Sequence, residues 1–250
     1  MGYGEIAREY HENGFGVVPG FFSPEELVEV DRQLSRYLQE SLSDLEPGEA
    51  YYEDGGGGAV RCVFRINQRS GYFAGLMRDP RLIALVEALY PGAPAEADGV
   101  MLIDKAPFAA YEFPYHQDNA YQFWNPAEAV AVTLALDEAS DDNGTIVCLK
   151  GSHRAPILPH QPSGVTGASL GLLEKPDLSR YPEVALDLKP GDLSLHHVNV
   201  IHRTGPNRTA HHRRNLGFAY HSSRAQRDRE AHARYEEHLG RINSSIEPVN

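Results

Sequence analysis

Two residues with metal-binding side chains stand two positions apart near the middle of this 250-residue chain, His116 and Asp118. In a β-strand the side chains alternate between faces, so residues two apart point the same way. One more histidine from a neighbouring strand would complete a set of two histidines and one carboxylate. Such a set binds one face of a non-haem Fe(II) and leaves the opposite face open for oxygen and an organic ligand. The pattern therefore predicts a mononuclear iron site.

Three histidines in one later segment are candidates for the third ligand. Residues 193–207 have the sequence LSLHHVNVIHRTGPN. His202 ends an expected strand just before the Thr-Gly-Pro-Asn turn, where it is well placed to meet His116. His196 should share a face with His202, and His197 should lie on the opposite face. We favour His202 and expect the other two to line or support the site.

Two arginines, Arg213 and Arg214, lie on the strand expected to follow. Iron oxygenases with this ligand set usually need a 2-oxo acid, and its far carboxylate needs a fixed cation. A guanidinium offers two parallel donors, so it fixes orientation as well as charge. Neighbours in a strand point to opposite faces, so one arginine should point inward and the other toward solvent.

Helices are expected near the start of the chain. Residues 3–12 should form a short polar helix, and the strand 14–19 follows. Ser23 is a strong helix cap, because Pro24 and Glu26 occupy the positions that complete a capped start. That helix should run to about Leu42. A second long helix should begin at Asp79-Pro80 and end at Gly92.

Short strands then alternate with turns. They are expected at 99–104, 112–118, 129–137, 145–149, 184–188, 193–197, 199–203 and 214–221. Many short strands after two helices predict a mainly β fold with flanking helices, built on a double-sheet jelly roll. We expect one domain over residues 1–250, in which a helical region (residues 1–95) packs on a core of about 98–221. A charged helix should follow at 224–241.

Three further segments have expected roles. Residues 60–67 should form a strand whose core side carries Cys62, Phe64 and Ile66. The acidic, glycine-rich segment 45–58 is expected to be a loop, and 155–182 a long irregular insertion. Loops of this kind commonly determine substrate specificity.

Composition excludes several classes of protein. The formal net charge of −12 argues against a nucleic-acid partner. Two cysteines do not make a disulfide framework, which favours a reduced cytoplasmic protein. No apolar run approaches the ~18 residues that a membrane helix needs, so no membrane partner is expected.

The order and spacing of several motifs resemble the phytanoyl-CoA dioxygenase family over about residues 8–221. These motifs are His116-x-Asp118, Asn143-Gly144, Gly151-Ser-His153, Gly191-Asp192 and His202-x-x-Gly-Pro-Asn207 followed by Arg213. The resemblance implies a jelly-roll core and dependence on Fe(II), 2-oxoglutarate and O2. It implies iron ligands at His116, Asp118 and His202. It also implies that Arg213, eleven residues after His202, holds the 2-oxoglutarate.

Other residues receive weaker assignments. The family often has a tryptophan in the strand before the segment that corresponds to Ala135-Leu136-Asp137, where this chain has Thr133 and Leu134. The hydroxyl of Thr133 is a candidate for contact with 2-oxoglutarate instead. Arg61 lies where some relatives place a basic residue near the cosubstrate. The candidates for the substrate pocket are Tyr121, Trp124, Arg65 and Lys105.

The expected reaction is hydroxylation or another oxidation of a small molecule, with release of succinate and CO2. Asp118 retains the carboxylate ligand, which favours oxygen insertion over halogenation. Only four of the 23 basic residues are lysine, which favours bacterial small-molecule biosynthesis. The alternatives are another metalloenzyme, such as a zinc hydrolase, and a jelly-roll binding protein without activity. Substrate identity and oligomeric state are not determined by the sequence.

Overall fold

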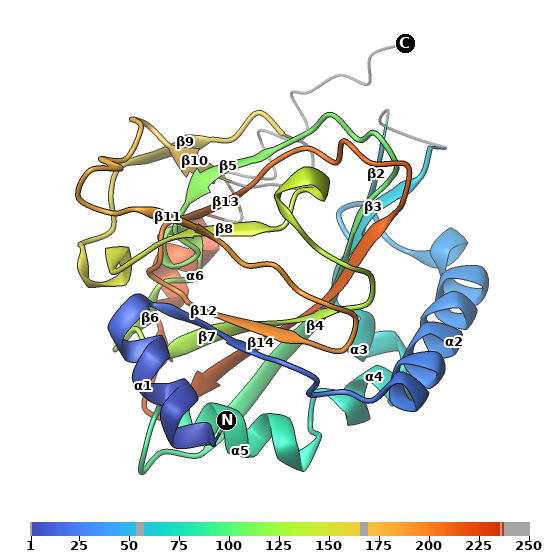
Figure 1. Cartoon of the computed structure of the whole chain (residues 1–250), viewed down its shortest axis with the longest axis horizontal. Coiled ribbons are helices and arrows are strands. Elements are labelled where there is room, and N and C mark those ends of the chain that lie inside the picture. Colours follow the sequence, from blue (N-terminus) through green and yellow to red (C-terminus); the bar gives the residue numbers. More distant parts are fainter. Residues whose placement is uncertain (1, 54–57, 166–169, 236, 238–250) are drawn as a thin grey trace.

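The computed structural model describes residues 2–53, 58–165, 170–235 and 237. Its centre is a pair of facing antiparallel β-sheets, as the jelly-roll prediction requires (Figure 1). The major sheet has seven strands in the order β1-β12-β7-β14-β4-β3-β2, and the minor sheet has four in the order β11-β8-β13-β5. The expected fold class is therefore confirmed.

The strand bounds are close to the expected ones in the core. The major sheet contains β1 (Phe15–Val18), β12 (Leu193–His197), β7 (Ala129–Ala135), β14 (Arg213–Ser222), β4 (Ala95–Lys105), β3 (Val60–Val63) and β2 (Ala50–Tyr52). The minor sheet contains β11 (Glu183–Ala185), β8 (Ile146–Leu149), β13 (His202–Thr204) and β5 (Phe113–His116). Two small ladders pair β10 (Leu170–Leu172) with β9 (His160–Pro162) and β15 (Gln226–Arg227) with β6 (Trp124–Asn125).

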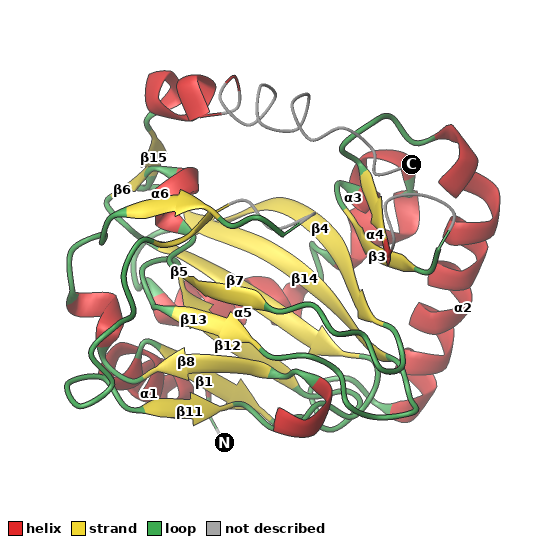
Figure 2. Cartoon of the chain, turned by 90° about the horizontal axis from the view of Figure 1, so that it is seen from above, coloured by secondary structure: helices red, strands yellow, loops and turns green. Residues whose placement is uncertain are grey.

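Helices cover the outer face of the major sheet (Figure 2). They are α1 (Tyr3–Asn13), α2 (Pro24–Ser41), α3 (Ile66–Arg69), α4 (Gly71–Leu76), α5 (Pro80–Leu89) and α6 (Asn119–Gln122), the last of which lies beside the minor sheet. The α2 start is the predicted capping box, because the Ser23 side chain accepts from Glu26 N and the Glu26 carboxylate accepts from Ser23 N. This reciprocal pair satisfies backbone donors that a helix start leaves free.

Alternation along the major sheet separates an apolar outer face from a polar inner face. Val132 and Leu134 of β7 are fully buried in the main core with the helices, so Thr133 between them faces the other way, into the jelly roll. Arg213 and Lys105 are also buried. The space between the sheets therefore holds polar and charged groups, which is where a polar ligand would bind.

The structure corrects the expected strand at 60–67. The strand β3 ends at Val63, because Arg65 has a left-handed backbone (φ 58°) and α3 begins at Ile66. The choice of core face was also wrong for this strand. Val63 packs in the main core, and its neighbour Cys62 lies on the opposite face. Ile66 is in the core, as expected, but it reaches it from a helix.

Other boundaries shift for identifiable reasons. The expected strand 199–203 shortens to β13, because Val200 N donates to His197 O in a tight turn before it. The segment 45–58 contains β2, which pairs with β3, while 54–57 lie outside the described residues. The insertion 155–182 contains the short β9–β10 ladder.

The expected helix at 224–241 begins later than predicted. Gln226 and Arg227 pair with β6 as β15, so the helical turn starts at residue 229. Residues 229–235 and 237 are helical, and the remainder of that prediction falls outside the described residues.

Candidate metal centre and cosubstrate site

The first pair of candidate ligands is brought together by the minor sheet. His116 at the end of β5 and His202 at the start of β13 are partners in the antiparallel ladder, with ring centroids 4.1 Å apart. Asp118 completes the group, and one ligand atom from each of the three residues lies within 4.8 Å of the others.

Asp118 reaches the group by a route that strand alternation did not predict. The strand β5 ends at His116, and Asp118 has helical backbone angles (φ −58°, ψ −34°) at the start of α6. Its carboxylate makes no capping hydrogen bond to that helix. A turn between strand and helix, rather than alternation along one strand, therefore directs the carboxylate toward the imidazoles.

Backbone carbonyls orient both imidazoles. The Nδ1 atoms of His116 and His202 lie 2.8 Å from Pro114 O and 3.1 Å from Val200 O. An Nδ1–H that donates to a carbonyl leaves Nε2 with a free lone pair, which is the form that binds a metal. The Nε2 atoms face Asp118 Oδ1 at 3.5 and 3.7 Å, respectively. Two neutral imidazole nitrogens and one carboxylate oxygen are a donor set that fits Fe(II).

The protonation states agree with this role. Burial by itself would raise the pKa of Asp118, but the surrounding histidines, His202 first, hold it well below its usual range. Burial, followed by the charge of His116, lowers the pKa of His202 well below its usual value. An ionised carboxylate beside a neutral imidazole is the state from which a metal displaces no proton.

The two rival histidines lie outside this group. His196 approaches Asp118 Oδ2 with its Nε2 at 3.3 Å, and its ring centroid is 4.4 Å from that of His202. His197 lies on the opposite face of β12, where its ring packs on Tyr10. His196 therefore lies beside the ligand group, as expected, whereas His197 faces away from it, and the expectation that His197 lines or supports the site is not met.

Two buried cations lie on the inner face of the major sheet. Arg213 and Lys105 face each other across the β14–β4 ladder and are 2% and 0% exposed. Lys105 donates to Gly205 O at 2.5 Å and to Tyr111 O at 3.0 Å. Arg213 donates to Gly144 O at 3.0 Å, and its Nε has no hydrogen-bond partner among the described residues. Within the described ranges, no carboxylate forms an ion pair with either cation.

Burial has electrostatic consequences for this pair. It lowers the pKa of Arg213 to about 10. Burial, and then the positive charge of Arg213, lowers the pKa of Lys105 to about 7. A buried cation without a counter-ion is costly, and an anion between the two would remove that cost. The arrangement thus suits a ligand carboxylate.

The neighbouring arginines separate as expected. Arg214 points away from Arg213 and pairs with Asp137 at 2.9 Å and Asp31 at 2.6 Å. It therefore ties β14 to helix α2 and to the segment after β7.

Arg61 lies beside the cationic pair through an aromatic ring. Its guanidinium sits 3.9 Å from the ring centroid of Tyr111, and Lys105 Nζ lies 4.3 Å from the same centroid. Arg61 also pairs with Glu53 at 3.3 Å. Tyr111 was missed by sequence reasoning, because nothing local marks an aromatic residue that two distant cations share.

Hydroxyl groups are placed on the inner faces as well. Thr133 has Ser194 and Gly217 as its partners on the two neighbouring strands. The hydroxyls of Ser194 and Thr204 are buried without a hydrogen-bond partner among the described residues. Sequence reasoning overlooked both. The position of Thr204 could have been predicted, since it lies two residues after His202 in the same strand and should face the same side.

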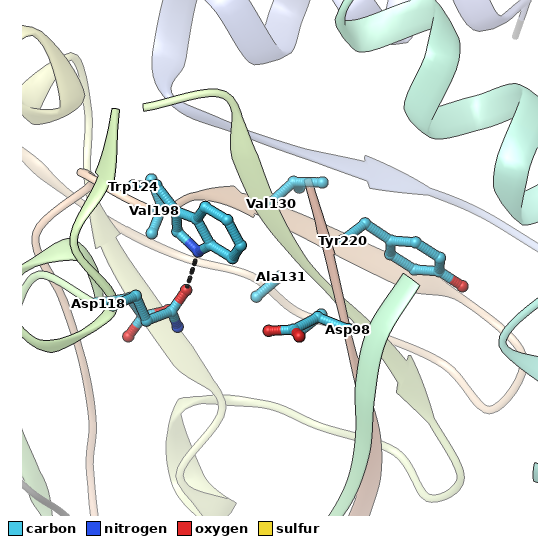
Figure 3. Close-up of a pocket in the computed structure, with 9 residues that line it drawn as sticks. Asp98, Asp118, Trp124, Val130, Ala131, Val198 and Tyr220 are labelled. Carbon is cyan, nitrogen blue, oxygen red and sulfur yellow. Dashed lines mark hydrogen bonds between the residues drawn. The ribbon is translucent and has the colours of Figure 1, made fainter. Parts of the chain in front are cut away.

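Tyr121 and Trp124 lie beside the candidate metal ligands. Tyr121 Oη donates to Asp118 Oδ1 at 2.5 Å, and its ring stacks on that of His116 with centroids 6.3 Å apart. Trp124 and Asp118 line a small cavity, toward which Asp98 also points (Figure 3). The dashed bond in Figure 3 joins Trp124 Nε1 to Gln122 Oε1, at 3.1 Å.

The remaining pocket candidates are not found there. Lys105 lies with Arg213, rather than at the rim of a substrate pocket. Arg65 is exposed at the start of α3, away from the small cavity that Asp118 and Trp124 line. Only Tyr121 and Trp124 of the four candidates thus lie next to Asp118.

Comparison with known proteins decides the family. Residues 10–215 match the family model described as phytanoyl-CoA dioxygenase (PhyH). The chain belongs to this family. It is similar to a probable alpha-ketoglutarate-dependent hypophosphite dioxygenase of Stutzerimonas stutzeri, with 26% identity over 87% of this chain and 78% of the relative. It is also similar to the peroxisomal phytanoyl-CoA dioxygenase of Rattus norvegicus, with 27% identity over 88% and 68% of the two chains.

A solved structure confirms the fold of this family member. The epimerase SnoN, in complex with Fe3+, alpha-ketoglutarate and nogalamycin RO, superposes with a TM-score of 0.72 at 23% identity. The match covers 89% of this chain and 84% of SnoN. Family membership and the His-Asp-His group together identify an iron- and 2-oxoglutarate-dependent dioxygenase. Among the residues that the structure describes, every helix is too short or too polar to cross a membrane.

Proposed function

We propose that His116, Asp118 and His202 hold the Fe(II), and that Arg213 and Lys105 hold the far carboxylate of 2-oxoglutarate. The observation that carries this assignment is the pair of buried cations, which has no carboxylate partner within the described ranges. A dicarboxylate ligand would pair with them from one end while its other end reaches the metal. The arginine fixes orientation through two parallel donors, and the lysine adds a point charge.

The neighbouring groups have supporting roles in this proposal. Arg61 acts through the Tyr111 ring, which it and Lys105 share, and so limits where the lysine can move. The hydroxyls of Thr133, Ser194 and Thr204 face the interior, where they would replace water as hydrogen-bond donors to the bound cosubstrate. Bound iron and 2-oxoglutarate supply the oxidising chemistry with O2. The protein supplies positions, charges and a site from which water is excluded.

The substrate is proposed to be a small organic molecule that enters on the side of Tyr121 and Trp124. Aromatic side chains there are suited to a pocket wall, and Asp118 lies directly behind them. The reaction is hydroxylation or another oxidation of this molecule, with release of succinate and CO2. We further propose a role in bacterial natural-product biosynthesis in the cytoplasm, and the fold that the chain shares with the epimerase SnoN from nogalamycin biosynthesis supports the biosynthetic part of this proposal. The whole chain is proposed to work as one domain.

An anaerobic titration with Fe(II) and then 2-oxoglutarate tests these assignments. The chelate of the two gives a weak visible charge-transfer band. We expect the band in the wild-type protein, no band in His202→Ala, and a band that needs far more 2-oxoglutarate in Arg213→Ala. Tight metal binding without any band in the wild type would remove the cosubstrate assignment. An unaltered titration in His202→Ala would remove that residue from the ligand set.

A further inference from the structure

We infer that His196 is a positioning residue that holds the second carboxylate oxygen of Asp118, so that Asp118 presents only one oxygen to the metal. This inference rests on the proposed role of Asp118 as a ligand. The two oxygens of this carboxylate have different surroundings. Oδ1 faces the Nε2 atoms of His116 and His202, whereas Oδ2 faces His196 Nε2 at 3.3 Å.

The carboxylate needs such a partner because it is buried. Asp118 is 6% exposed, and it makes no capping bond to the helix it begins. Among the described residues its side-chain hydrogen-bond partners are Tyr121, on Oδ1, and His196, on Oδ2. Without His196, Oδ2 would be a buried anionic oxygen with no donor. Rotation of the carboxylate, so that Oδ2 also binds the metal, would then stabilise this oxygen.

His196 is well placed to prevent that rotation. It lies in β12, which is paired on both sides, with Phe15 of β1 and Ala131 of β7 as its register partners. The residue is 6% exposed and its ring lies against His202, so its room to move is small. The three ligand candidates come from the minor sheet and the turn after β5. His196 comes from the major sheet, so it links the rigid sheet to the ligand set.

The consequence concerns the open coordination positions. A carboxylate that binds through both oxygens takes two metal positions, and a 2-oxo acid needs two adjacent free ones. Partners of this kind behind a metal ligand typically change metal affinity or activity by ~10–100-fold when they are removed. The expected effect of losing His196 therefore falls on the metal site itself, before any substrate is present.

The test compares His196→Gln, which retains an N–H donor, with His196→Met, which fills similar space without one. Each is titrated anaerobically with Co(II), whose visible d–d spectrum reports coordination number and geometry, and then with 2-oxoglutarate. We expect His196→Met to change the spectrum and to weaken 2-oxoglutarate binding by about tenfold or more. His196→Gln should stay within about threefold of the wild type. His197→Gln, in the same strand on the opposite face, is the control for general damage to β12 and should leave the spectrum unchanged.

The outcomes separate this inference from the proposed function. A wild-type protein that binds no Co(II) would overturn both. Binding in the wild type with an identical spectrum and affinity in His196→Met would overturn only the role of His196. An equal loss in the Gln and Met variants would also overturn it, because the donor would then not be what matters. Thermal unfolding of each variant shows whether the fold is retained.

Discussion

The ring of Tyr235 stacks on that of Tyr121, with centroids 5.9 Å apart and planes 24° apart. Tyr121 in turn stacks on His116, at an interplanar angle of 21°. Three roughly parallel rings thus lead from the segment after β14 to a candidate iron ligand. This segment lies beyond residues 10–215, which match the family. It is anchored by the β15–β6 ladder and by a bond from Asp228 N to Phe123 O.

Loss of the Tyr235 ring should open the substrate side of the site to water. In Tyr235→Ala we expect more consumption of 2-oxoglutarate without substrate, and a lower unfolding temperature, since an aromatic pair contributes about 0.5–1.5 kcal/mol. Tyr235→Phe keeps the ring and should behave as the wild type. Arg234→Ala, at an exposed neighbour in the same turn, is the matched control. Equal succinate formation in the Ala and Phe variants would contradict the expectation.

The neighbouring arginines provide a matched pair for the cosubstrate assignment. Arg213→Gln should raise the dissociation constant of 2-oxoglutarate by roughly 10²–10⁴-fold, because removing one partner of a buried ion pair costs about 3–5 kcal/mol. Arg214→Gln removes the same charge from the adjacent position, but it breaks the pairs with Asp137 and Asp31. It should lower the unfolding temperature and leave 2-oxoglutarate affinity nearly unchanged. Similar affinity losses in both variants would contradict the assignment.

Affinity for 2-oxoglutarate should fall as the pH rises above about 7. In the free protein, burial lowers the pKa of Lys105 to about 7. A bound carboxylate favours the charged amine, so the pKa rises on binding. Below pH 7 the amine is already charged and affinity should be level. Above it, binding must take up a proton, which weakens affinity by up to about tenfold per pH unit.

The pH dependence has a direct check in Lys105→Met. The charged groups that act on Lys105 are Arg213, Glu112, Arg61 and Glu53. These four groups are unchanged in the variant, so any pH dependence of 2-oxoglutarate affinity that they cause would persist. We expect the variant to bind 2-oxoglutarate more weakly and with no slope over about one pH unit on either side of neutrality. A slope equal to that of the wild type would assign the titration to another group. Titrations of the charge-transfer band at several pH values provide the measurement.

Gly144 should tolerate no side chain. Its φ is 77°, and an added Cβ would lie 2.3 Å from Gly205 O and 2.9 Å from Lys105 Cδ. Gly164 has a similar φ of 72°, and no atom of the described residues lies within 4 Å of a Cβ added there, so Gly164→Ala measures the backbone cost. That cost is about 1–2 kcal/mol. Gly144→Ala should lower the free energy of unfolding by clearly more than Gly164→Ala, and equal losses in chemical denaturation would contradict this.

Local patterns in the sequence determined much of the fold. The capped start of α2 and the bounds of β12 follow from short-range signals, namely Ser23 with Glu26 and an apolar alternation at 193–197. The opposite orientation of Arg213 and Arg214 follows from strand alternation in the same way. Such features depend on neighbours in the chain, which a sequence displays directly.

The ligand types were also evident from the sequence, although one geometric argument was wrong. His116, Asp118 and His202 form the predicted group, but Asp118 lies after the end of β5 rather than within it. The turn after β5 directs the Asp118 carboxylate toward the imidazoles. The ligand types were thus predicted correctly, but the backbone conformation that brings them together was not.

What only the tertiary structure decided is which distant residues share a space. Lys105 lies beside Arg213 because β4 pairs with β14, and His196 reaches Asp118 because the two sheets face each other. Pairing register between strands that lie far apart in the chain depends on the packing of the whole core. No local periodicity encodes it. The sequence by itself therefore determined the metal-binding chemistry, and the tertiary structure determined the groups that surround and orient it.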